Sequence, residues 1–248
     1  MDEPIVGEPG KPGRTLWLVR HGESTWNALG LVQGQRTEPR LTSRGAAQAR
    51  GLADRLRSRE VRSLYTSDLL RAAETARPIA AALGLEPVVD RRLRERSFGA
   101  AEGAPSSRLG SEWSGLDGGR VVDADAAPPG GESVRDLRRR VGGFLDELAA
   151  DDELWSGPPG DVVLVVHGGV VRAALAHLDG VPEEAMSWDP VGNGEVVGRP
   201  LVLPGWSAPP GANPAAVPVA ASVTASSVPP TVVPGAVPAA ADPLRGAR

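Results

Sequence analysis

The chain alternates between short apolar runs and longer stretches in which apolar residues recur at helical spacing. The short runs predict strands at 16–19, 61–65, 87–89, 161–166 and 195–203. The run from Val162 to Val166 is continuously apolar, as the central strands of a parallel sheet are. We therefore expect this run, together with the first one, to form the middle of a sheet.

Four stretches predict helices, at 42–58, 68–83, 133–150 and 170–178. Thr42 or Ser43 is the expected N-cap of the first helix, and Ser67 that of the second. Pro78 is expected to kink or end the second helix. Loops are expected at 27–40 and 91–99, with an irregular insertion at 104–129.

The order of these elements predicts the fold. Strands that alternate with helices imply a largely parallel sheet with helices on both faces. We expect an α/β protein built as a three-layer α/β/α sandwich with a mostly parallel central sheet.

Length and composition predict one domain with a tail. We expect a flexible N-terminus at 1–13, the domain at 14–204, and a Pro/Ala/Val-rich disordered tail at 205–248. Ten prolines lie between Pro204 and Pro243, where no apolar period is present.

Charge and cysteine content limit the kinds of partner and cofactor that the protein can bind. The chain has 27 basic and 31 acidic residues, a formal charge of −4, so no nucleic-acid partner is expected. It has no cysteine and three histidines, so neither disulfides nor a thiolate metal site is possible, and we expect no metal and no other cofactor. Since no targeting segment and no membrane-length apolar run is evident, a cytoplasmic protein without a membrane partner is expected.

The two strongest strands both end in histidine. Arg20-His21-Gly22 follows the first, and His167-Gly168 follows the strand at 161–166. If these strands are parallel neighbours, both imidazoles emerge at one edge of the sheet, where ligands of open α/β folds bind. The alternative is that Arg20 and His21 merely mark where the strand surfaces.

Two histidines, two arginines and one carboxylate suit the handling of a phosphate monoester. Arg20 and Arg71 offer guanidinium forks that match phosphate oxygens. A neutral imidazole can act as nucleophile, and Glu95 can protonate a leaving oxygen.

Five ordered motifs between residues 16 and 169 resemble the histidine phosphatase superfamily, also called phosphoglycerate mutase-like. They are Leu18-Val19-Arg20-His21-Gly22-Glu23-Ser24 with Trp26-Asn27, Ser67-x-Leu69-x-Arg71-Ala72-x-x-Thr75-Ala76, Leu93-Arg94-Glu95 with Phe98-Gly99, Gly130-Gly131-Glu132-Ser133, and Val166-His167-Gly168-Gly169. The resemblance implies a phosphoglycerate mutase-like fold, with a small phosphorylated substrate as its partner.

The resemblance also implies roles for individual residues. His21 would accept the phosphoryl group, while Arg20, Arg71 and His167 clamp its oxygens. Glu95 would be the proton donor and later the base for water. Asn27 would add a side-chain hydrogen bond, and the Gly168 amide another.

The sequence departs from the family pattern at two places. The stretch Gln33–Thr42 aligns only with an extra residue or with Glu38 where Asp is usual. Ala101 stands before Glu102-Gly103, where the family often has an aromatic residue, so one wall of the pocket differs.

Each assignment has a structural alternative. Arg71 and Glu74 could form an exposed helical pair. Glu95 could pair on the surface with the arginines around it, which are Arg91, Arg92, Arg94 and Arg96. Arg138-Arg139-Arg140 is expected to be a solvated helix face, and Glu132 to favour a helix dipole. His177 matches no motif and is expected to be structural or exposed.

We expect a phosphatase that hydrolyses a small phosphate monoester through a phosphohistidine at His21. One alternative is a phosphoglycerate mutase, which resembles the chain in every motif but generally has a longer, more basic insertion. The insertion here is short and contains Glu112, Asp117, Asp123 and Asp125, which disfavours a bisphosphate. A second alternative is a catalytically silent member that binds phosphorylated ligands or partners. The oligomeric state, monomer or homodimer, stays open.

Overall fold

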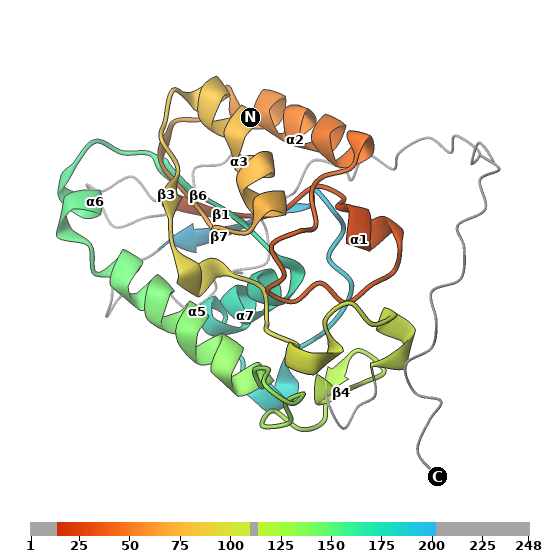
Figure 1. The fold of residues 1–248 in the computed structure, drawn as a ribbon. Coiled ribbons are helices and arrows are strands. Elements are labelled where there is room, and N and C mark those ends of the chain that lie inside the picture. Colours follow the sequence, from red (N-terminus) through yellow and green to blue (C-terminus); the bar gives the residue numbers. More distant parts are fainter. Residues whose placement is uncertain (1–13, 110–113, 202–248) are drawn as a thin grey trace, which may run out of the picture.

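The computed structural model describes residues 14–109 and 114–201 (Figure 1). The predictions for residues 1–13 and 205–248, and for Glu112, lie outside the described residues. A central sheet has the strand order β3-β2-β6-β1-β7. Its strands are β1 at Arg14–Arg20, β2 at Val61–Thr66, β3 at Val88–Val89, β6 at Asp161–Val166 and β7 at Val196–Leu201. Strands β3, β2, β6 and β1 are parallel, and β7 is antiparallel to β1.

Helices cover both faces of this sheet. The helices are α1 at Thr25–Ala28, α2 at Ser43–Leu56, α3 at Leu70–Leu83, α5 at Val134–Ala149, α6 at Asp152–Ser156 and α7 at Gly168–Leu178. Figure 1 shows α2 and α3 on one side of the sheet and α5 and α7 on the other. The expected three-layer α/β/α sandwich with a mostly parallel sheet is confirmed. No helix of the described residues is long and apolar enough to cross a membrane.

The alternation of side chains along the central strands builds the two halves of the core. Leu18 and Leu164 pack into the cluster that includes α5 and α7, whereas Val19 and Val165 pack into the cluster that includes α2 and α3. Each of these four side chains is at most 1% exposed. Burial of one such side chain stabilises the fold by roughly 1.5–3 kcal/mol, so the central strands are apolar on both faces.

The register of β1 and β6 determines where the two histidines that follow these strands lie. Arg20 pairs with Val166, the last residue of each strand. The His21 N–H donates to the Val166 carbonyl at 2.9 Å. His21 and His167 therefore follow directly from paired positions at one edge of the sheet.

Two expectations for the second helix are wrong. Leu69, not Ser67, is the N-cap of α3, and Leu69 makes no side-chain capping bond. The Ser67 hydroxyl instead contacts an imidazole nitrogen of His167. Of the kink or end expected at Pro78, the end is the second wrong expectation: helix α3 continues through Pro78 to Leu83, because the packing of Ile79 and its neighbours against the core offsets the one backbone hydrogen bond that proline removes.

Several segments expected to be irregular contain short elements. The loop after β1 holds α1, and the polar loop before β6 holds α6. The insertion holds a two-stranded hairpin of β4 at Leu116–Asp117 and β5 at Arg120–Val121. Single turns of 3-10 helix lie at Arg91–Leu93, Gly99–Ala101, Ser106–Arg108 and Glu183–Ala185.

Candidate active site

His21 follows the end of β1 and is 2% exposed. Its Nδ1 lies 2.7 Å from the carbonyl oxygen of Gly22. A carbonyl oxygen can only accept, so Nδ1 carries the proton and Nε2 keeps its lone pair. The Gly22 N–H donates to the Thr75 hydroxyl at 3.1 Å, which ties the turn to α3. The backbone thus selects the tautomer in which Nε2 can attack an electrophile.

Two glycines let this turn approach the start of α2. A Cβ on Gly22 would lie 2.5 Å from the carbonyl oxygen of Gly45, and a Cβ on Gly45 would lie 2.0 Å from the carbonyl oxygen of Glu23. Both approaches are closer than atoms can come, so only glycine fits at either position. The close contact holds His21 against a rigid helix.

His167 lies beside His21 and is fully buried. The two ring centroids are 5.1 Å apart with an interplanar angle of 60°. Nε2 of His167 lies 2.8 Å from the hydroxyl of Ser67. Its Nδ1 has no hydrogen-bond partner in the part of the chain that the structure describes. The pairing of β1 with β6 therefore brings the two predicted histidines together.

Arg71 reaches the same place from α3 and is fully buried. Its Nη1 donates to the Arg36 carbonyl at 2.9 Å and its Nη2 to the Gly34 carbonyl at 2.8 Å. The alternative of an exposed pair with Glu74 is wrong, since Glu74 accepts from Arg40 at 2.8 Å. These carbonyls hold the far end of the guanidinium, whereas its Nε has no partner among residues 14–109 and 114–201.

Arg20 completes the cluster from the last position of β1. Its Nη1 donates to the carbonyl of Val191, in the segment that precedes β7. Like that of Arg71, the buried Nε of Arg20 finds no hydrogen-bond partner among the described residues. The alternative that Arg20 and His21 merely mark where the strand surfaces is wrong for the buried His21.

Within the described residues, three buried polar atoms near His21 have no hydrogen-bond partner: Arg20 Nε, Arg71 Nε and His167 Nδ1. Each such atom costs about 1–3 kcal/mol when it stays unpaired. Among the described residues, the hydrogen-bond acceptors of both guanidinium groups are backbone carbonyl oxygens, which carry no negative charge. These features together define a site for a small anion with several oxygens.

Burial and the two cations control protonation of the imidazoles. Burial, Arg71 and Arg20 lower the pKa of His21 well below its ordinary value. Burial, Arg71 and His21 do the same to the pKa of His167. Burial also lowers the pKa of Arg71 to about 10, which still leaves it charged at neutral pH. Both imidazoles are therefore neutral near pH 7, as a nitrogen nucleophile requires.

Glu95 approaches from the loop after β3. Its Oε1 accepts from the Arg96 N–H at 2.8 Å and its Oε2 from the Gly169 N–H at 3.1 Å. A Cβ on Gly169 would lie 2.2 Å from Oε1, so glycine admits the carboxylate to the start of α7. Glu95 therefore lies next to the residues that follow His167.

Glu95 could have formed a surface ion pair with one of its four flanking arginines. This alternative is wrong for three of them, because they pair with other carboxylates. Arg91 and Arg94 pair with Asp68, and Arg92 pairs with Asp90 and Glu147. The guanidinium of Arg96 donates to backbone carbonyls, including those of Glu132, Ser114 and Ala126. Arg91, Arg92 and Arg94 thus pair with other carboxylates, and Arg96 holds the loop through backbone carbonyls.

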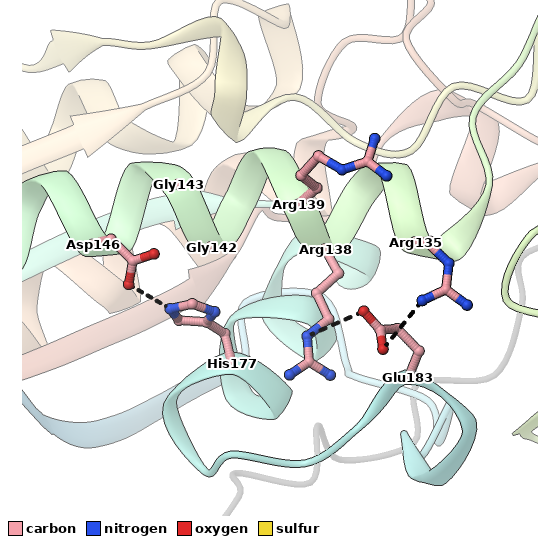
Figure 2. A pocket seen from close by; sticks show the side chains of 8 residues that line it. All are labelled: Arg135, Arg138, Arg139, Gly142, Gly143, Asp146, His177 and Glu183. Atoms are coloured by element: carbon pink, nitrogen blue, oxygen red, sulfur yellow. Dashed lines mark hydrogen bonds and ion pairs between the residues drawn. The ribbon is translucent and has the colours of Figure 1, made fainter.

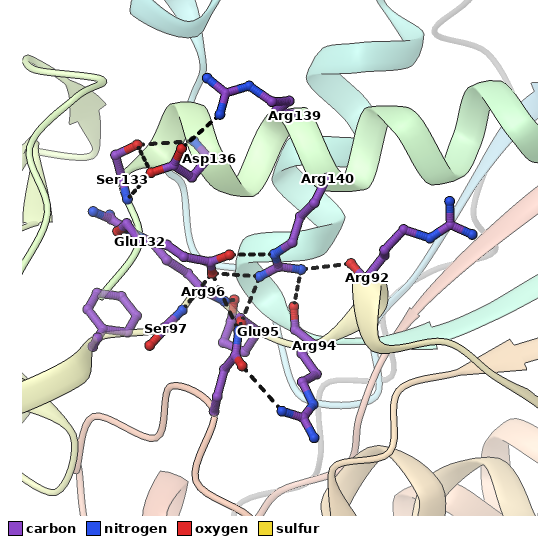
Figure 3. A network of polar contacts seen from close by, with 12 residues as sticks. Arg92, Arg94, Glu95, Arg96, Ser97, Glu132, Ser133, Asp136, Arg139 and Arg140 are labelled. Carbon is purple, nitrogen blue, oxygen red and sulfur yellow. Dashed lines mark hydrogen bonds and ion pairs between the residues drawn. The ribbon is translucent and has the colours of Figure 1, made fainter. Parts of the chain in front are cut away.

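Arg140 of α5 fixes the loop that carries Glu95 (Figure 3). Its Nε and Nη2 donate to the two carboxylate oxygens of Glu132 at 2.7 and 2.8 Å. Its Nη1 donates to the carbonyls of Arg92 and Arg94 at 2.7 Å, and Nη2 also donates to that of Glu95 at 2.9 Å. All five N–H donors of a guanidinium are therefore used.

This arrangement differs from two expectations, one for the arginines of α5 and one for Glu132, which precedes that helix. Arg138-Arg139-Arg140 is not a uniformly solvated face, because Arg138 and Arg140 are 15% and 18% exposed while Arg139 is 71% exposed. Glu132 does not act mainly through the helix dipole either. It joins the loop of Glu95 to α5 through Arg140.

Asn27 is oriented by a residue that sequence reasoning missed. Its Oδ1 accepts from the Ser24 N–H and from Asn193 Nδ2, both at 3.1 Å. Asn193 Nδ2 also lies 3.2 Å from the His21 carbonyl oxygen. With Oδ1 occupied, the Asn27 amide nitrogen is the group left to donate to a ligand. The only sequence signal for Asn193 is a Gly-Asn-Gly turn before the last strand.

Gly168 begins α7 and adjoins Arg20. A Cβ on Gly168 would lie 3.6 Å from Arg20 Nε. His177, at the other end of α7, lies outside this cluster, as expected. Its Nε2 contacts Asp146 at 2.8 Å in a shallow pocket beside α5, where Arg138 also pairs with Glu183 (Figure 2).

The described residues, 14–109 and 114–201, contain no group of three or more His, Asp or Glu side chains placed to hold a metal ion. The expectation that no metal is required stays a prediction.

Comparison with known proteins identifies the protein family. Residues 16–198 match the family model of the histidine phosphatase superfamily (branch 1). The chain is also 40% identical over 178 residues to the probable phosphoglycerate mutase GpmB of Yersinia enterocolitica, an alignment that covers 68% of this chain and 77% of the relative. The protein therefore belongs to the histidine phosphatase superfamily, as its motifs suggest.

Solved structures agree with this assignment. The fold is similar to that of a mycobacterial glucosyl-3-phosphoglycerate phosphatase in complex with VO3, at 33% identity and a TM-score of 0.66 over 75% of this chain and 92% of that one. It is also similar to a phosphoserine phosphatase from Entamoeba histolytica in complex with 3-phosphoglyceric acid, at 26% identity and a TM-score of 0.60 over 75% of this chain and 90% of that one. Relatives of the chain thus include both phosphatases and a probable mutase.

Proposed function

We propose that this protein is a phosphatase that hydrolyses a small phosphate monoester through a phosphohistidine at His21. Two observations carry the proposal. Three nitrogens near His21, namely Arg20 Nε, Arg71 Nε and His167 Nδ1, have no hydrogen-bond partner among the described residues. The Nε2 of His21 keeps its lone pair, because Nδ1 carries the ring proton. Donors fixed before the substrate arrives stabilise charge on a transferring phosphoryl group without reorganisation.

In the first step the phosphoryl oxygens bind between Arg20, Arg71 and His167. Nε2 of His21 forms a bond to phosphorus as the bond from phosphorus to the ester oxygen breaks. Glu95 gives its proton to that leaving oxygen. The His21 Nδ1–H bond to the Gly22 carbonyl stabilises the positive charge that develops on the phosphorylated ring.

In the second step water attacks the phosphorus of the phosphohistidine. Glu95, now a carboxylate, accepts a proton from that water. The bond between phosphorus and Nε2 breaks, and its electron pair returns to His21. Inorganic phosphate leaves, and the neutral imidazole and protonated Glu95 are restored.

Trapping of the intermediate tests this proposal. Wild-type protein mixed with a labelled phosphate monoester is quenched in alkaline denaturant, in which a phosphorus–nitrogen bond survives. We expect label on the wild type and on the control variant His177→Ala, and none on His21→Ala. Equal labelling of His21→Ala, or phosphate release at the wild-type rate by that variant, would refute the assignment.

The second candidate is a phosphoglycerate mutase, which the name of the 40% identical relative favours. Against it, the described insertion carries three acidic residues, Asp117, Asp123 and Asp125, and all three are exposed. Negative charge there disfavours a substrate with two phosphates. The measurement that separates the two is the fate of the label, which a phosphatase delivers to water and a mutase to a second hydroxyl of the substrate.

A third possibility, a catalytically silent member that binds phosphorylated ligands or partners, is tested by the same labelling. The proposed nucleophile, proton donor and oxygen ligands are all present, which supports an enzyme. Binding of a phosphate monoester without any label on His21 would favour the silent member.

A further inference from the structure

Two loops hold the proposed phosphate ligand Arg71 and the proposed proton donor Glu95. Residues 33–36, here called the clamp loop, supply the two carbonyl oxygens that accept from the guanidinium of Arg71. Residues 94–98, here called the donor loop, carry Glu95. Since the two loops lie about 60 residues apart in the sequence, only tertiary contacts can set one relative to the other.

Glu102 joins the two loops through one oxygen atom. Its Oε1 accepts from the Gln35 N–H of the clamp loop at 2.9 Å and from the Phe98 N–H of the donor loop at 3.0 Å. The Ser97 hydroxyl lies 3.5 Å from the same oxygen. Hydrogen bonds from an N–H to a carboxylate are stronger than those to a neutral acceptor. A displacement of this oxygen would therefore release both loops.

The backbone that carries Glu102 is fixed beside the clamp loop. The Gly103 N–H donates to the Val32 carbonyl at 2.8 Å, and the Val32 N–H donates to the Ala104 carbonyl at 2.9 Å. The Glu102 N–H donates to the Gly99 carbonyl at 3.1 Å. Because Val32 directly precedes the clamp loop, these bonds place the carboxylate of Glu102 against that loop.

Gly34 allows the carboxylate to approach this closely. A Cβ on Gly34 would lie 2.0 Å from Glu102 Oε1, and Gly34 has a φ of +50°, in the left-handed region that favours glycine. The carbonyl oxygen of the same residue accepts from Arg71 Nη2 at 2.8 Å. One residue therefore lies against Glu102 and also holds Arg71.

Gln35 makes a second link between the loops. Its N–H binds Glu102, while its side-chain Nε2 donates to the carbonyl oxygen of Glu95 at 3.1 Å. The residue that Glu102 holds thus contacts the backbone of the proposed proton donor itself. A shift of the clamp loop would be transmitted to Glu95 by this bond.

The negative charge of Glu102 supports the same arrangement. Within residues 14–109 and 114–201, no cation forms an ion pair with Glu102. Burial lowers the pKa of Arg71 to about 10, and Glu95 and Glu102 oppose that change. Glu102 thus stabilises the charged form of Arg71 while the guanidinium hydrogen bonds go to the clamp loop.

We propose that Glu102 is a positioning residue that sets Arg71 and Glu95 relative to each other, so that phosphate binding and protonation of the leaving oxygen both depend on one carboxylate. The inference rests on the proposed phosphatase function. The alternative is that Glu102 only caps the turn that precedes it, through its bonds to residues 97 and 98. That alternative predicts an effect on the donor loop alone.

Two readouts on Glu102→Ala test the proposal. The dissociation constant of vanadate, measured by calorimetry, reports on Arg71. The ratio of single-turnover phosphorylation rates for an alkyl phosphate and an aryl phosphate reports on Glu95. We expect vanadate to bind about 3- to 10-fold more weakly and the alkyl-to-aryl ratio to fall about 10-fold. A change in only one readout, or in neither, would overturn the proposal.

The conservative variant Glu102→Gln separates hydrogen bonding from charge. Its side-chain oxygen has the same reach and can accept from both backbone N–H groups, so it should recover most of the vanadate affinity and most of the rate ratio. If Glu102→Gln were as impaired as Glu102→Ala, the link through hydrogen bonds would be wrong.

Asp151→Ala is a matched control for loss of stability. Asp151 also accepts from two backbone N–H groups through one oxygen, those of Glu153 at 2.9 Å and Leu154 at 3.2 Å. It caps α6, which precedes β6 and so lies at the edge of the sheet opposite to His21. Asp151→Ala should destabilise the fold and leave both readouts unchanged. Equal changes in Asp151→Ala and Glu102→Ala would overturn the proposal, since they would reflect general destabilisation.

Hydrogen exchange separates this proposal from the proposed function, because it needs no catalysis. In ligand-free Glu102→Ala the amides of Gln35 and Phe98 should exchange about 10-fold faster than in the wild type, since each loses its acceptor. Faster exchange of both amides, together with weaker vanadate binding, would support the link between the loops even if the wild type failed to become labelled. Unchanged exchange at Gln35 would overturn it, whatever the activity.

Discussion

The hydroxyl of Ser67 lies 2.8 Å from Nε2 of His167, at the opposite side of the ring from the unpartnered Nδ1. The imidazole is neutral, because burial and Arg71 hold its pKa well below the ordinary value. When Ser67 donates to Nε2, the single ring proton resides on Nδ1. We therefore expect Ser67 to be a positioning residue, which makes His167 Nδ1 the donor that the proposed phosphate site requires.

Removal of this hydroxyl should change the tautomer of His167. In Ser67→Ala we expect the ¹⁵N spectrum of the His167 ring to show a mixture of tautomers, with vanadate bound about 5- to 15-fold more weakly, the loss of one hydrogen bond of ~1–1.5 kcal/mol. Ser67→Thr should restore both, and the exposed Ser106→Ala should change neither. An Nδ1–H tautomer that persists unmixed in Ser67→Ala would contradict the role.

Glu95 is tested by the dependence of rate on the leaving group. Glu95→Gln keeps the size but removes the proton, so phosphorylation by alkyl phosphates should slow by roughly 10²- to 10⁴-fold. Aryl phosphates with acidic leaving groups need less protonation and should slow much less. Single-turnover rates for the two substrate types give the ratio. The exposed Glu86→Gln is the control, and an unchanged ratio in Glu95→Gln would remove Glu95 as the proton donor.

The architecture and the meeting of the two histidines could be predicted because they depend on local signals. The apolar runs of β1 and β6 predict central strands, and parallel pairing then brings His21 and His167 to one edge. The helical spacing around Thr42 predicts α2 and its cap, which the structure confirms. Arg71 and Glu95 were identified by resemblance, and no local pattern distinguishes either from a surface charge.

The supporting residues could not be predicted because their partners are distant in sequence. Ser67 precedes a helix and has the usual chemistry of an N-cap, yet its partner is 100 residues away. Arg140 has the spacing of a solvated helical residue, but a loop some 45 residues earlier covers it. Asn193 sits in a turn whose contact with His21 exists only once β7 has paired with β1.

If Glu95 is the proton donor, Arg140 should affect catalysis through the loop that carries it. Arg140→Lys keeps the charge but cannot make five hydrogen bonds, so Glu95 should lose its fixed position. We expect phosphorylation by alkyl phosphates to slow by about 10²-fold, with aryl phosphates affected less and KM little changed. Arg139→Lys, on the exposed side of the same helix, is the control. A loss of equal size for both substrate types would indicate general damage to the fold rather than displacement of the proton donor.

The buried histidines should make stability depend on pH. His21 and His167 have pKa values well below the ordinary value in the folded state, whereas an unfolded histidine binds a proton near pH 6.5. As the pH falls below about 6.5, the unfolded state takes up protons that the folded state excludes. The free energy of unfolding should therefore decrease, by up to about 1.4 kcal/mol per pH unit for each histidine.

Urea unfolding of the phosphate-free protein between pH 7.5 and pH 5.5 measures this slope. In His21→Gln the slope should be smaller by the contribution of one histidine. A stability that is constant over this range in the wild type would show that the folded protein protonates these rings as readily as the unfolded chain does.

Exhaustive chelation should leave phosphate release unchanged, since the proposed chemistry uses only imidazole, guanidinium and carboxylate groups. The measurement is activity after dialysis against a chelator, with and without added divalent ions. A loss of activity that one divalent ion restores would point to a different site.

The pairing of β1 with β6 has a consequence for how the protein loses activity on heating. His21 and His167 are separated by a backbone hydrogen-bond ladder at the centre of the sheet, not by a hinge or a surface loop. Their spacing cannot change unless the innermost strands separate, which requires the whole core to open. Thermal inactivation and cooperative melting of the domain should thus occur at one temperature, without an intact but inactive form between them.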